Sequence, residues 1–465
     1  MIVSSIHKLK GLWLTVKAGL WFVPTVMVTT SIILAITFIE IDSWASDDFL
    51  EQFPRLFGAG SDGSRGMLTA IATSMITVAG LTFSLTITAL AQASSQYTSR
   101  ILRNFMTNRT NQLVLGFFVG LFSYCLVVLR TIRGGDEDKF IPSLSVLFGL
   151  VLAIVGIAVL IYFIHHIAVS IQASHIVSLA AEETIQAVHR LFPQDVGKEA
   201  PEAENQDVLK KLENEPQRLI PASASGYLQS IDEDTLFNFA KANDVVVQME
   251  KAIGEFVVQD TLLVTIIGNL QVEDADIETL NEAFTISRYR TIHQDAAFGI
   301  RQLVDIALKA LSPGVNDTTT AILSIDYLSA ILAQLAQRRI EKPFRTDESG
   351  NRKVRLIAKS LTFDSFVAEA FDQIRDSAAG NTAVFIRLLV AIKTVASQTA
   401  SAGRLGILLE QAKRVADSAN HSVGAVYNRD LIRRQFADTL KQLSAEEHIS
   451  ILPAAPMERK NANQA

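Results

Sequence analysis

The sequence predicts a membrane protein that is mainly α-helical, with four transmembrane helices followed by a cytoplasmic region that holds a small α+β domain and a helical domain. Its mean hydropathy of +0.27 is high for a chain in which 19% of the residues are charged. Four apolar segments have the roughly 20 residues that a helix needs to cross a bilayer. The connections between these segments differ in charge, which predicts an orientation in the membrane.

The four apolar segments lie in residues 1–166, which we expect to form the transmembrane domain. Lysines precede the first segment, as in a signal peptide. Its apolar run is too long for one, however, and acidic residues follow at Glu40 and Asp42, so we expect a retained helix. The segments are 20–39, 67–91, 113–129 and 144–164.

The charges of the connections set the expected orientation. The connection after the second segment contains Arg100, Arg103 and Arg109 and no acidic residue, whereas the connection after the first contains Asp47 and Glu51. Basic connections remain on the cytoplasmic side of a membrane. The sequence therefore predicts a multi-pass protein of the bacterial cytoplasmic (inner) membrane with both termini in the cytoplasm.

The second segment is rich in hydroxyl side chains, and several of them share one face of the predicted helix. At about 3.6 residues per turn, small and polar residues recur along one line that continues beyond the apolar part. We name this line the polar stripe, and its residues are Thr73, Thr77, Gly80, Ser84, Thr88, Gln92, Gln96, Arg100 and Arg103. It predicts a polar path with a basic mouth. The alternative is a packing seam, because small residues let helices approach closely in lipid.

Beyond the membrane segments, the chain divides by composition. A helical stalk and linker are expected over 167–215, since no glycine or proline interrupts the helical pattern before Pro193 and a polar, proline-containing stretch follows. A small α+β domain is expected over 216–270 and a helical domain over 271–450. Residues 451–465 are expected to be a disordered tail.

Short β-branched runs predict strands within 218–231, 244–250 and 255–267. Between the first two, Asp232 is placed to cap a helix over 233–242. From Ile277 onward the pattern is helical, and further helices are expected over 363–377 and 381–399. One predicted helix has a continuous apolar face formed by Ile300, Leu303, Val304, Ala307 and Leu311.

A turn follows that apolar helix. Ser312, Pro313 and Gly314 predict its end, and Asn316 and Asp317 are placed to cap the next helix. The sequence therefore predicts two helices joined by a short turn.

Several short motifs stand out along the chain. They are Ala79-Gly80-Leu81-Thr82-Phe83-Ser84, Gln96-Tyr97-Thr98-Ser99-Arg100, Gly226-Tyr227, Gly254-Glu255-Phe256-Val257, Asp295 with Phe298-Gly299, and Ala310-Leu311-Ser312-Pro313-Gly314-Val315-Asn316-Asp317. These motifs resemble those of domain-of-unknown-function family 2254, a family of bacterial membrane proteins. The resemblance covers the chain from the first membrane helix to about residue 400, and it implies a multi-spanning membrane protein without an established activity. Ser99 and Thr318 depart from the family pattern, which favours proline at both places.

Nothing in the sequence indicates an enzyme. It lacks a phosphate-binding loop, a dinucleotide-binding glycine motif and a Cys/His metal cluster, so we expect no catalytic residue, cofactor or metal. The net charge of −6, without a long basic run, gives no sign of nucleic-acid binding. One polar cluster is suited to hold a phosphate or carboxylate, although helix capping and ion pairing explain it more simply. Its residues are Arg288, Arg290, His293 and Asp295, with Asn316 and Asp317.

Two classes of function remain, and in both the lipid bilayer is a partner. The first is an ion channel or pore gated by its soluble domain. Four helices are few to enclose a path, so this reading requires a homo-oligomer with the second helix facing the axis. The alternative is a membrane-anchored regulatory or scaffolding protein whose cytoplasmic domain binds a ligand or partner. The sequence does not identify the ion or ligand.

Overall fold

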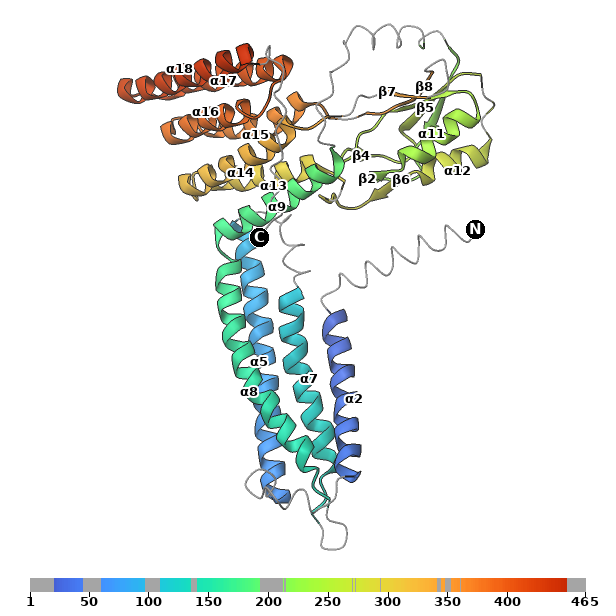
Figure 1. Cartoon of the computed structure of the whole chain (residues 1–465), viewed down its shortest axis with the longest axis vertical. Coiled ribbons are helices and arrows are strands. Elements are labelled where there is room, and N and C mark those ends of the chain that lie inside the picture. Colours follow the sequence, from blue (N-terminus) through green and yellow to red (C-terminus); the bar gives the residue numbers. More distant parts are fainter. Residues whose placement is uncertain are drawn as a thin grey trace, which may run out of the picture. The chain divides into compact units, whose positions relative to one another are not determined.

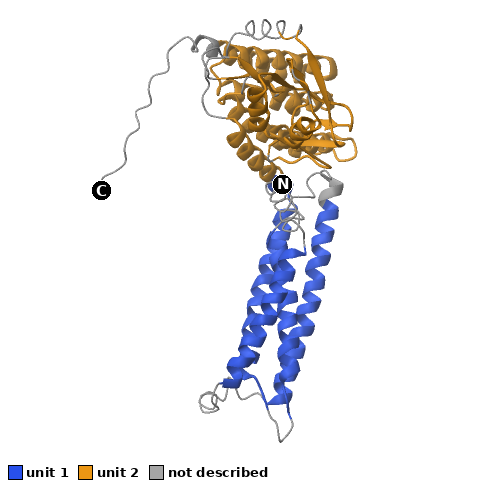
Figure 2. Cartoon of the chain, turned by 90° about the vertical axis from the view of Figure 1, so that its right-hand side faces the viewer, with its two compact units in different colours: residues 1–175 blue, residues 176–465 orange. Residues whose placement is uncertain are grey.

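The computed structural model describes residues 21–44, 60–96, 109–134, 140–192, 212, 215–269, 271, 273–292, 294–340, 344–347, 353–359 and 361–449. The chain forms two compact units, residues 1–175 (unit 1) and 176–465 (unit 2), which Figure 2 shows in different colours. The expected linker and the expected disordered tail lie almost entirely outside the described residues.

Unit 1 contains four long helices that run side by side (Figure 1). The four predicted apolar segments are confirmed as helices, and each helix extends past its predicted segment at one or both ends. The helices are α2 (Phe22–Trp44), α5 (Ser61–Gln96), α7 (Arg109–Thr131) and α8 (Ser143–Ser170). All four are long and apolar enough to cross a membrane, and so is one described helix of unit 2, α14 (Thr318–Ala336).

Helix α7 is at the centre of unit 1, because it packs against α2, α5 and α8. Two glycines bring it close to α2. A Cβ atom at Gly116 would meet the Met27 sulfur, and one at Gly120 would meet the Ser31 hydroxyl, each at 2.6 Å. Small residues at these two positions therefore allow the close helix approach that is common within membranes.

A buried carboxylate joins α2 to the start of α8. The Asp42 side chain, only 7% exposed, accepts hydrogen bonds from the backbone N–H groups of Leu144 and Ser145, both at 2.9 Å, and from the Ser145 hydroxyl at 2.5 Å. The Tyr124 hydroxyl of α7 donates to the Ser145 carbonyl at 2.9 Å. Asp42 therefore caps α8 from another helix, a role that its neighbours in the sequence do not reveal.

The helix that was expected to run on past His166 is interrupted, and this part of the prediction is wrong. Helix α8 ends at Ser170, and α9 (Ala173–Leu191) begins after a turn at Ile171 and Gln172. In this turn the Gln172 N–H donates to the Val169 carbonyl. A hydrogen bond from an N–H group to the carbonyl three residues earlier, as in a 3₁₀ turn, can end an α-helix without glycine or proline.

Unit 2 contains a β-rich part made of two sheets (Figure 1). Strands pair antiparallel throughout, except that β3 and β8 pair parallel. In sheet order, the five-stranded sheet contains β1 (Gln217–Pro221), β5 (Leu262–Ile267), β3 (Val246–Met249), β8 (Val354–Ile357) and β7 (Phe344–Thr346). The three-stranded sheet contains β4 (Phe256–Val257), β2 (Gly226–Ile231) and β6 (Phe284–Ser287).

The predicted strands and the Asp232 cap are confirmed, but the prediction of helix alone beyond Ile277 is wrong. Helix α11 (Glu233–Ala242) begins at Asp232, which accepts the Thr235 N–H, and α12 (Asp274–Glu282) precedes β6. Strands β6, β7 and β8 come from sequence that was expected to be helical. The sheets thus include segments beyond residue 270. The sequence did not predict them because strands of three or four residues are too short to show a clear alternation of apolar and polar residues.

Helices α13 to α18 of unit 2 form a stack of three hairpins (Figure 1). The hairpins are α13 (Ala296–Leu311) with α14, α15 (Phe363–Ser377) with α16 (Thr382–Ala396), and α17 (Ala402–Ser422) with α18 (Val426–Ile449). Each hairpin packs on the next, α13 on α15 on α17 and α14 on α16 on α18. Polar pairs such as Arg387–Asp326 and Lys393–Asp438 join successive hairpins.

Two buried arginines hold helix ends in unit 2. The Arg338 guanidinium donates to the Phe192 carbonyl at 2.6 Å, just past the end of α9. The Arg404 guanidinium donates to the Ala336 carbonyl at the end of α14 and to the Arg338 carbonyl, both at 2.9 Å. The two arginine residues are only 5% and 4% exposed, so they satisfy carbonyls that water reaches poorly.

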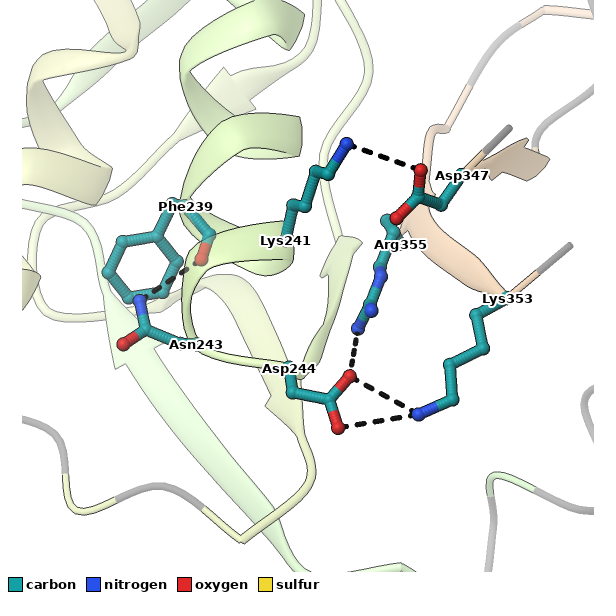
Figure 3. Close-up of polar contacts among 7 residues, drawn as sticks. All are labelled: Phe239, Lys241, Asn243, Asp244, Asp347, Lys353 and Arg355. Carbon is teal, nitrogen blue, oxygen red and sulfur yellow. Dashed lines mark hydrogen bonds and ion pairs between the residues drawn. The ribbon is translucent and has the colours of Figure 1, made fainter. Parts of the chain in front are cut away.

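Ion pairs fasten the β7–β8 hairpin to the end of α11, as Figure 3 shows. Asp244 pairs with Arg355 at 2.7 Å and with Lys353 at 3.2 Å, and Lys241 pairs with Asp347 at 3.3 Å. The Arg355 and Lys353 side chains hold the pKa of the Asp244 carboxyl below its ordinary value. The hairpin lies between α14 and α15 in the chain, so these pairs hold a late segment of the sequence to the β-rich part.

Candidate functional site

The described part of the polar stripe lies on the outer surface of α5. Thr73, Thr77, Gly80, Ser84, Thr88 and Gln92 are all exposed within the chain. The opposite side of the helix is buried against the rest of unit 1, through residues that include Leu68, Met75, Ala79, Thr82 and Ala89. Among the described residues, the stripe is therefore not a seam between helices of one chain, and the packing alternative concerns contacts between copies.

Large apolar residues flank the stripe on the exposed surface of α5. Ile76, Phe83 and Ile87 lie along one side of it and Leu81 lies along the other, each between 42% and 50% exposed. Within the stripe, a Cβ atom at Gly80 would meet nothing within 4 Å. The exposed surface of α5 is thus a narrow line of small and hydroxyl residues between two apolar edges.

The hydroxyl groups of α5 can be satisfied by their own helix. Thr77 donates to the Thr73 carbonyl at 2.8 Å, and Thr86, on the bundle side, donates to the Thr82 carbonyl at 2.8 Å. Such bonds allow threonine to lie in an apolar environment, and they leave the oxygen lone pairs available to accept hydrogen bonds.

The basic end of the stripe lies outside the described residues. Gln96 is the last residue of α5, but its side chain is not described, and Arg100 and Arg103 follow the helix in the same undescribed stretch. The basic mouth stays a prediction.

Two signature motifs of unit 2 meet around the ion pair of Asp295 and Arg290, whose carboxylate is buried. Asp295 caps α13 by accepting the Phe298 N–H at 3.0 Å, and its other oxygen accepts the Arg290 Nε–H at 2.8 Å. Gly254 has a φ of +88°, and a Cβ there would lie 2.5 Å from the Asp295 carboxylate and 2.6 Å from the Arg290 guanidinium. The positive φ and the lack of space for a Cβ atom both require glycine at this position. The motif at 254–257 therefore lets the backbone lie directly against this ion pair.

The next signature residues continue the same cluster. The Arg290 guanidinium lies over the Phe298 ring, 5.1 Å from its centroid. A Cβ at Gly299 would overlap the Thr184 hydroxyl, so this glycine lets α13 pack closely on α9. Capping and ion pairing thus account for Asp295, as the simpler interpretation of the polar cluster predicted. His293 of that cluster is not described.

The last signature motif forms the turn between α13 and α14. Ser312 caps the end of α13, and its hydroxyl donates to the Lys309 carbonyl at 2.6 Å. Pro313, Gly314 and Asn316 are exposed, and Asn316 adopts a positive φ of 48°. The predicted helix end and restart are confirmed.

Asp317 caps α14, as the sequence predicted. It accepts the Thr320 N–H at 3.0 Å and the Thr320 hydroxyl at 2.5 Å. These hydrogen bonds hold the pKa of the Asp317 carboxyl below its ordinary value. Thr318, where the family pattern has proline, is the first residue of α14, a position at which proline is readily accommodated, so both residues fit the same turn.

A cavity that the sequence did not indicate lies between the β-rich part and the helices of unit 2. It has a volume of about 150 Å³, and we name it the apolar cavity. Its walls come from the end of α9, the β-rich part, the start of α13, the segments beside the β7–β8 hairpin, and α15. Residues so far apart in the chain share no local pattern, so only the folded structure brings them together.

No metal site is present among the described residues, because no three His, Cys, Asp or Glu side chains gather there. His165 and His166 in α8 and His175 in α9 do not form such a group. In the polar cluster of unit 2 that the sequence indicated, Asp295 and Asp317 cap helices and Arg290 pairs with Asp295.

Comparison with known proteins agrees with this architecture. The family described as "Predicted membrane protein (DUF2254)" matches residues 17–394. An uncharacterized protein of Mycobacterium tuberculosis strain CDC 1551 is 31% identical over 438 residues, which cover 92% of this chain and 81% of the relative. Uncharacterized proteins of Mycobacterium bovis and of M. tuberculosis strain H37Rv are each 30% identical over the same shares. No solved structure matches the chain. The chain therefore belongs to the DUF2254 family of predicted membrane proteins.

Proposed function

We propose that this protein is an oligomeric channel or pore of the bacterial cytoplasmic membrane, in which α5 of each copy turns its polar stripe towards a shared path. The observation that carries the proposal is the exposure of the stripe. Six of its residues face outward from unit 1, while the opposite side of α5 is buried in the bundle. The proposal includes no enzymatic reaction.

The exposed surface of α5 is suited to an axis of symmetry. A strip of hydroxyls and glycine offers hydrogen-bonding groups to water or ions, and its apolar edges suit contact with neighbouring protein. The described helices α2, α5 and α8 pack against α7 and do not surround the stripe. A closed path therefore requires several copies, and a cyclic homo-oligomer is the simplest arrangement.

The proposed topology has four spans and both termini in the cytoplasm. Helix α14 is excluded from the spans because 61% of its most apolar window is buried inside unit 2, as in the core of a folded domain. The basic connection after α5 then lies in the cytoplasm. Arg100 and Arg103 of each copy would concentrate anions at that end and repel cations.

Ion flux through purified protein in liposomes tests the channel directly. Thr77→Leu and Ser84→Leu add bulk to the stripe, and we expect each to reduce flux by at least tenfold. Thr86→Leu is the matched control, because Thr86 is a partly buried hydroxyl on the bundle side of the same helix. Arg100→Glu should shift selectivity towards cations.

The outcomes separate the channel from a packing surface. Flux that responds equally to Thr77→Leu and Thr86→Leu, or no flux in any ionic condition, would leave the stripe as a contact between copies. A monomer in mild detergent and in nanodiscs would remove the shared path altogether.

Cysteine labelling on intact cells tests the orientation in a Cys125→Ala background. A cysteine at Asp62, exposed at the start of α5, should react with a membrane-impermeant reagent. A cysteine at Ser377, exposed at the end of α15, should react only after lysis. Equal reaction of both positions on intact cells contradicts the proposed topology.

The alternative function, a membrane-anchored regulator whose cytoplasmic domain binds a ligand, is favoured by one observation. Unit 2 contains the apolar cavity, bounded by segments from both its β-rich part and its helical stack. This cavity gives the alternative a definite site. It is also compatible with a channel that its soluble domain controls.

A further inference from the structure

The apolar cavity has walls made mainly of aliphatic and aromatic side chains. Six of the larger ones are Phe192, Ile231, Met249, Ile253, Ile340 and Phe366. A space of about 150 Å³ accepts a benzene-sized molecule, and apolar walls favour an apolar group. The cavity therefore fits a compact apolar group better than a polar one.

Both carboxylates that line the cavity already accept hydrogen bonds from protein groups. Asp295 uses one oxygen for the Phe298 N–H and the other for Arg290. Glu233 accepts two hydrogen bonds from Arg345, at 3.0 and 3.2 Å. Neither carboxylate is therefore well placed to receive a cationic ligand.

Lys359 differs from these residues, since it retains a hydrogen-bond donor. Its ammonium donates to the Glu250 carbonyl at 3.0 Å and pairs with the Glu255 carboxylate at 2.9 Å. An ammonium group has three N–H donors, so one remains beyond these two partners among the described residues. The side chain is 48% exposed and lines the cavity, so it can turn that donor to a ligand.

We propose that the apolar cavity binds a small monocarboxylate with a compact apolar body, of about the size of benzoate or a branched five-carbon acid. The body fills the space against Ile253 and Phe366, and the carboxylate accepts a hydrogen bond from Lys359. In small-molecule sites, apolar walls commonly bury the body of the ligand, and a few polar or charged groups bind its polar end and fix its orientation. The proposal does not depend on the channel function.

The position of the cavity indicates what binding would stabilise. Phe192 follows α9, and its carbonyl is held by Arg338. Arg345 belongs to β7, and Ile340 and Lys359 lie on either side of the β7–β8 hairpin. A ligand in contact with both segments would hold the end of α9 and the hairpin in place together.

The test uses full-length protein in nanodiscs and 4-fluorobenzoate, observed by fluorine NMR and by calorimetry. We expect saturable binding of 4-fluorobenzoate, with at least tenfold weaker binding of 4-fluorobenzyl alcohol and 4-fluorobenzylamine. Lys359→Met should weaken 4-fluorobenzoate binding at least tenfold, whereas Lys359→Arg should retain most of it. Lys309→Met is the matched control, because Lys309 is an exposed lysine of the same unit that does not line the cavity.

A second variant guards against a folding defect in the first. Ala252→Leu fills the cavity from its wall, and it should abolish binding while the far-ultraviolet circular dichroism stays that of the wild type. Equal binding of the acid, the alcohol and the amine would overturn the carboxylate assignment. Unchanged binding in both Lys359→Met and Ala252→Leu, or no saturable binding of any probe, would overturn the site itself.

Discussion

The two units place polar and apolar side chains in opposite ways. Unit 1 turns large apolar side chains outward, and Ile157 and Ile161 of α8 are 60% and 65% exposed. Unit 2 buries side chains of the same kind, and Phe371 and Phe385 are fully buried. The first pattern suits a protein surrounded by lipid and the second a protein surrounded by water.

This contrast shows which polar groups need an explanation in each unit. In unit 1, Asp42 is explained because it caps α8, whereas the described stripe residues of α5 lie on the outer surface, opposite the side of the helix that is buried in the bundle. In unit 2 polar side chains are ordinary, and the informative features are glycines at which the backbone approaches another group. Three substitutions test this distinction.

The largest effect is expected at Gly254 in unit 2. Gly254→Ala places a methyl group against the Asp295–Arg290 pair and forces a positive φ, so we expect a loss of about 2–4 kcal/mol in the free energy of unfolding. Chemical denaturation of the full chain, with hydrogen exchange read from peptides of β2, β4 and α13, measures this loss. Gly314→Ala is the control, since a Cβ there meets nothing within 4 Å, and its effect should stay within about 0.5 kcal/mol. Equal effects at the two glycines would contradict the close-approach argument.

An intermediate effect is expected at Asp42 in unit 1. Asp42→Ala removes three hydrogen bonds from the start of α8, and a loss of about 2 kcal/mol is expected for a buried charged cap. Hydrogen exchange at the Leu144 and Ser145 amides in nanodiscs should accelerate. Asp62→Ala, in the exposed first turn of α5, should leave those amides unchanged. Wild-type exchange at Leu144 and Ser145 in Asp42→Ala would show that the cap contributes nothing.

The smallest effect is expected at Asp317, and it should depend on pH. Because hydrogen bonds from Thr320 lower the pKa of the folded-state carboxyl below 3.8, the stabilisation is full above that unfolded-state value. It is lost as the pH falls through the lower, folded-state pKa. Asp317→Ala should therefore cost about 1 kcal/mol at neutral pH and progressively less in acid. Asp317→Asn keeps a capping oxygen and should remove the pH dependence.

Denaturation curves of the wild type and both Asp317 variants, recorded at several pH values, check this prediction. A loss in Asp317→Ala that stays constant down to the lowest pH would contradict the capping role of the carboxylate. Unchanged stability together with lost ligand binding would instead identify a functional site.

Local patterns in the sequence predicted the features that depend on neighbouring residues. Apolar length located the four helices of unit 1, and helical spacing placed the polar stripe on one face of α5. The helix caps at Asp232 and Asp317 were also predictable, because each aspartate accepts a hydrogen bond from the N–H group three residues later. Each of these features depends on residues within one or two helical turns.

Features that depend on distant partners were missed for the opposite reason. Asp42 was counted as a charge in a loop, because its partner Ser145 lies more than a hundred residues away. Arg404 gives no local sign that it caps α14. Strands β7 and β8 are too short to show alternation, and the apolar cavity exists only where five segments meet.

The parallel pairing of β3 with β8 has a consequence for the order of folding. Val247 pairs with Leu356, so the five-stranded sheet closes a loop of about a hundred residues that includes α13 and α14. On a ribosome, β3 emerges well before β8, and until then β3 is an edge strand that can pair with the wrong chain. Helices α13 and α14 pack against each other and both precede β8 in the chain, so this hairpin can form first. We therefore infer that the first helical hairpin folds while the sheet is still open, and that the β7–β8 hairpin completes the sheet last.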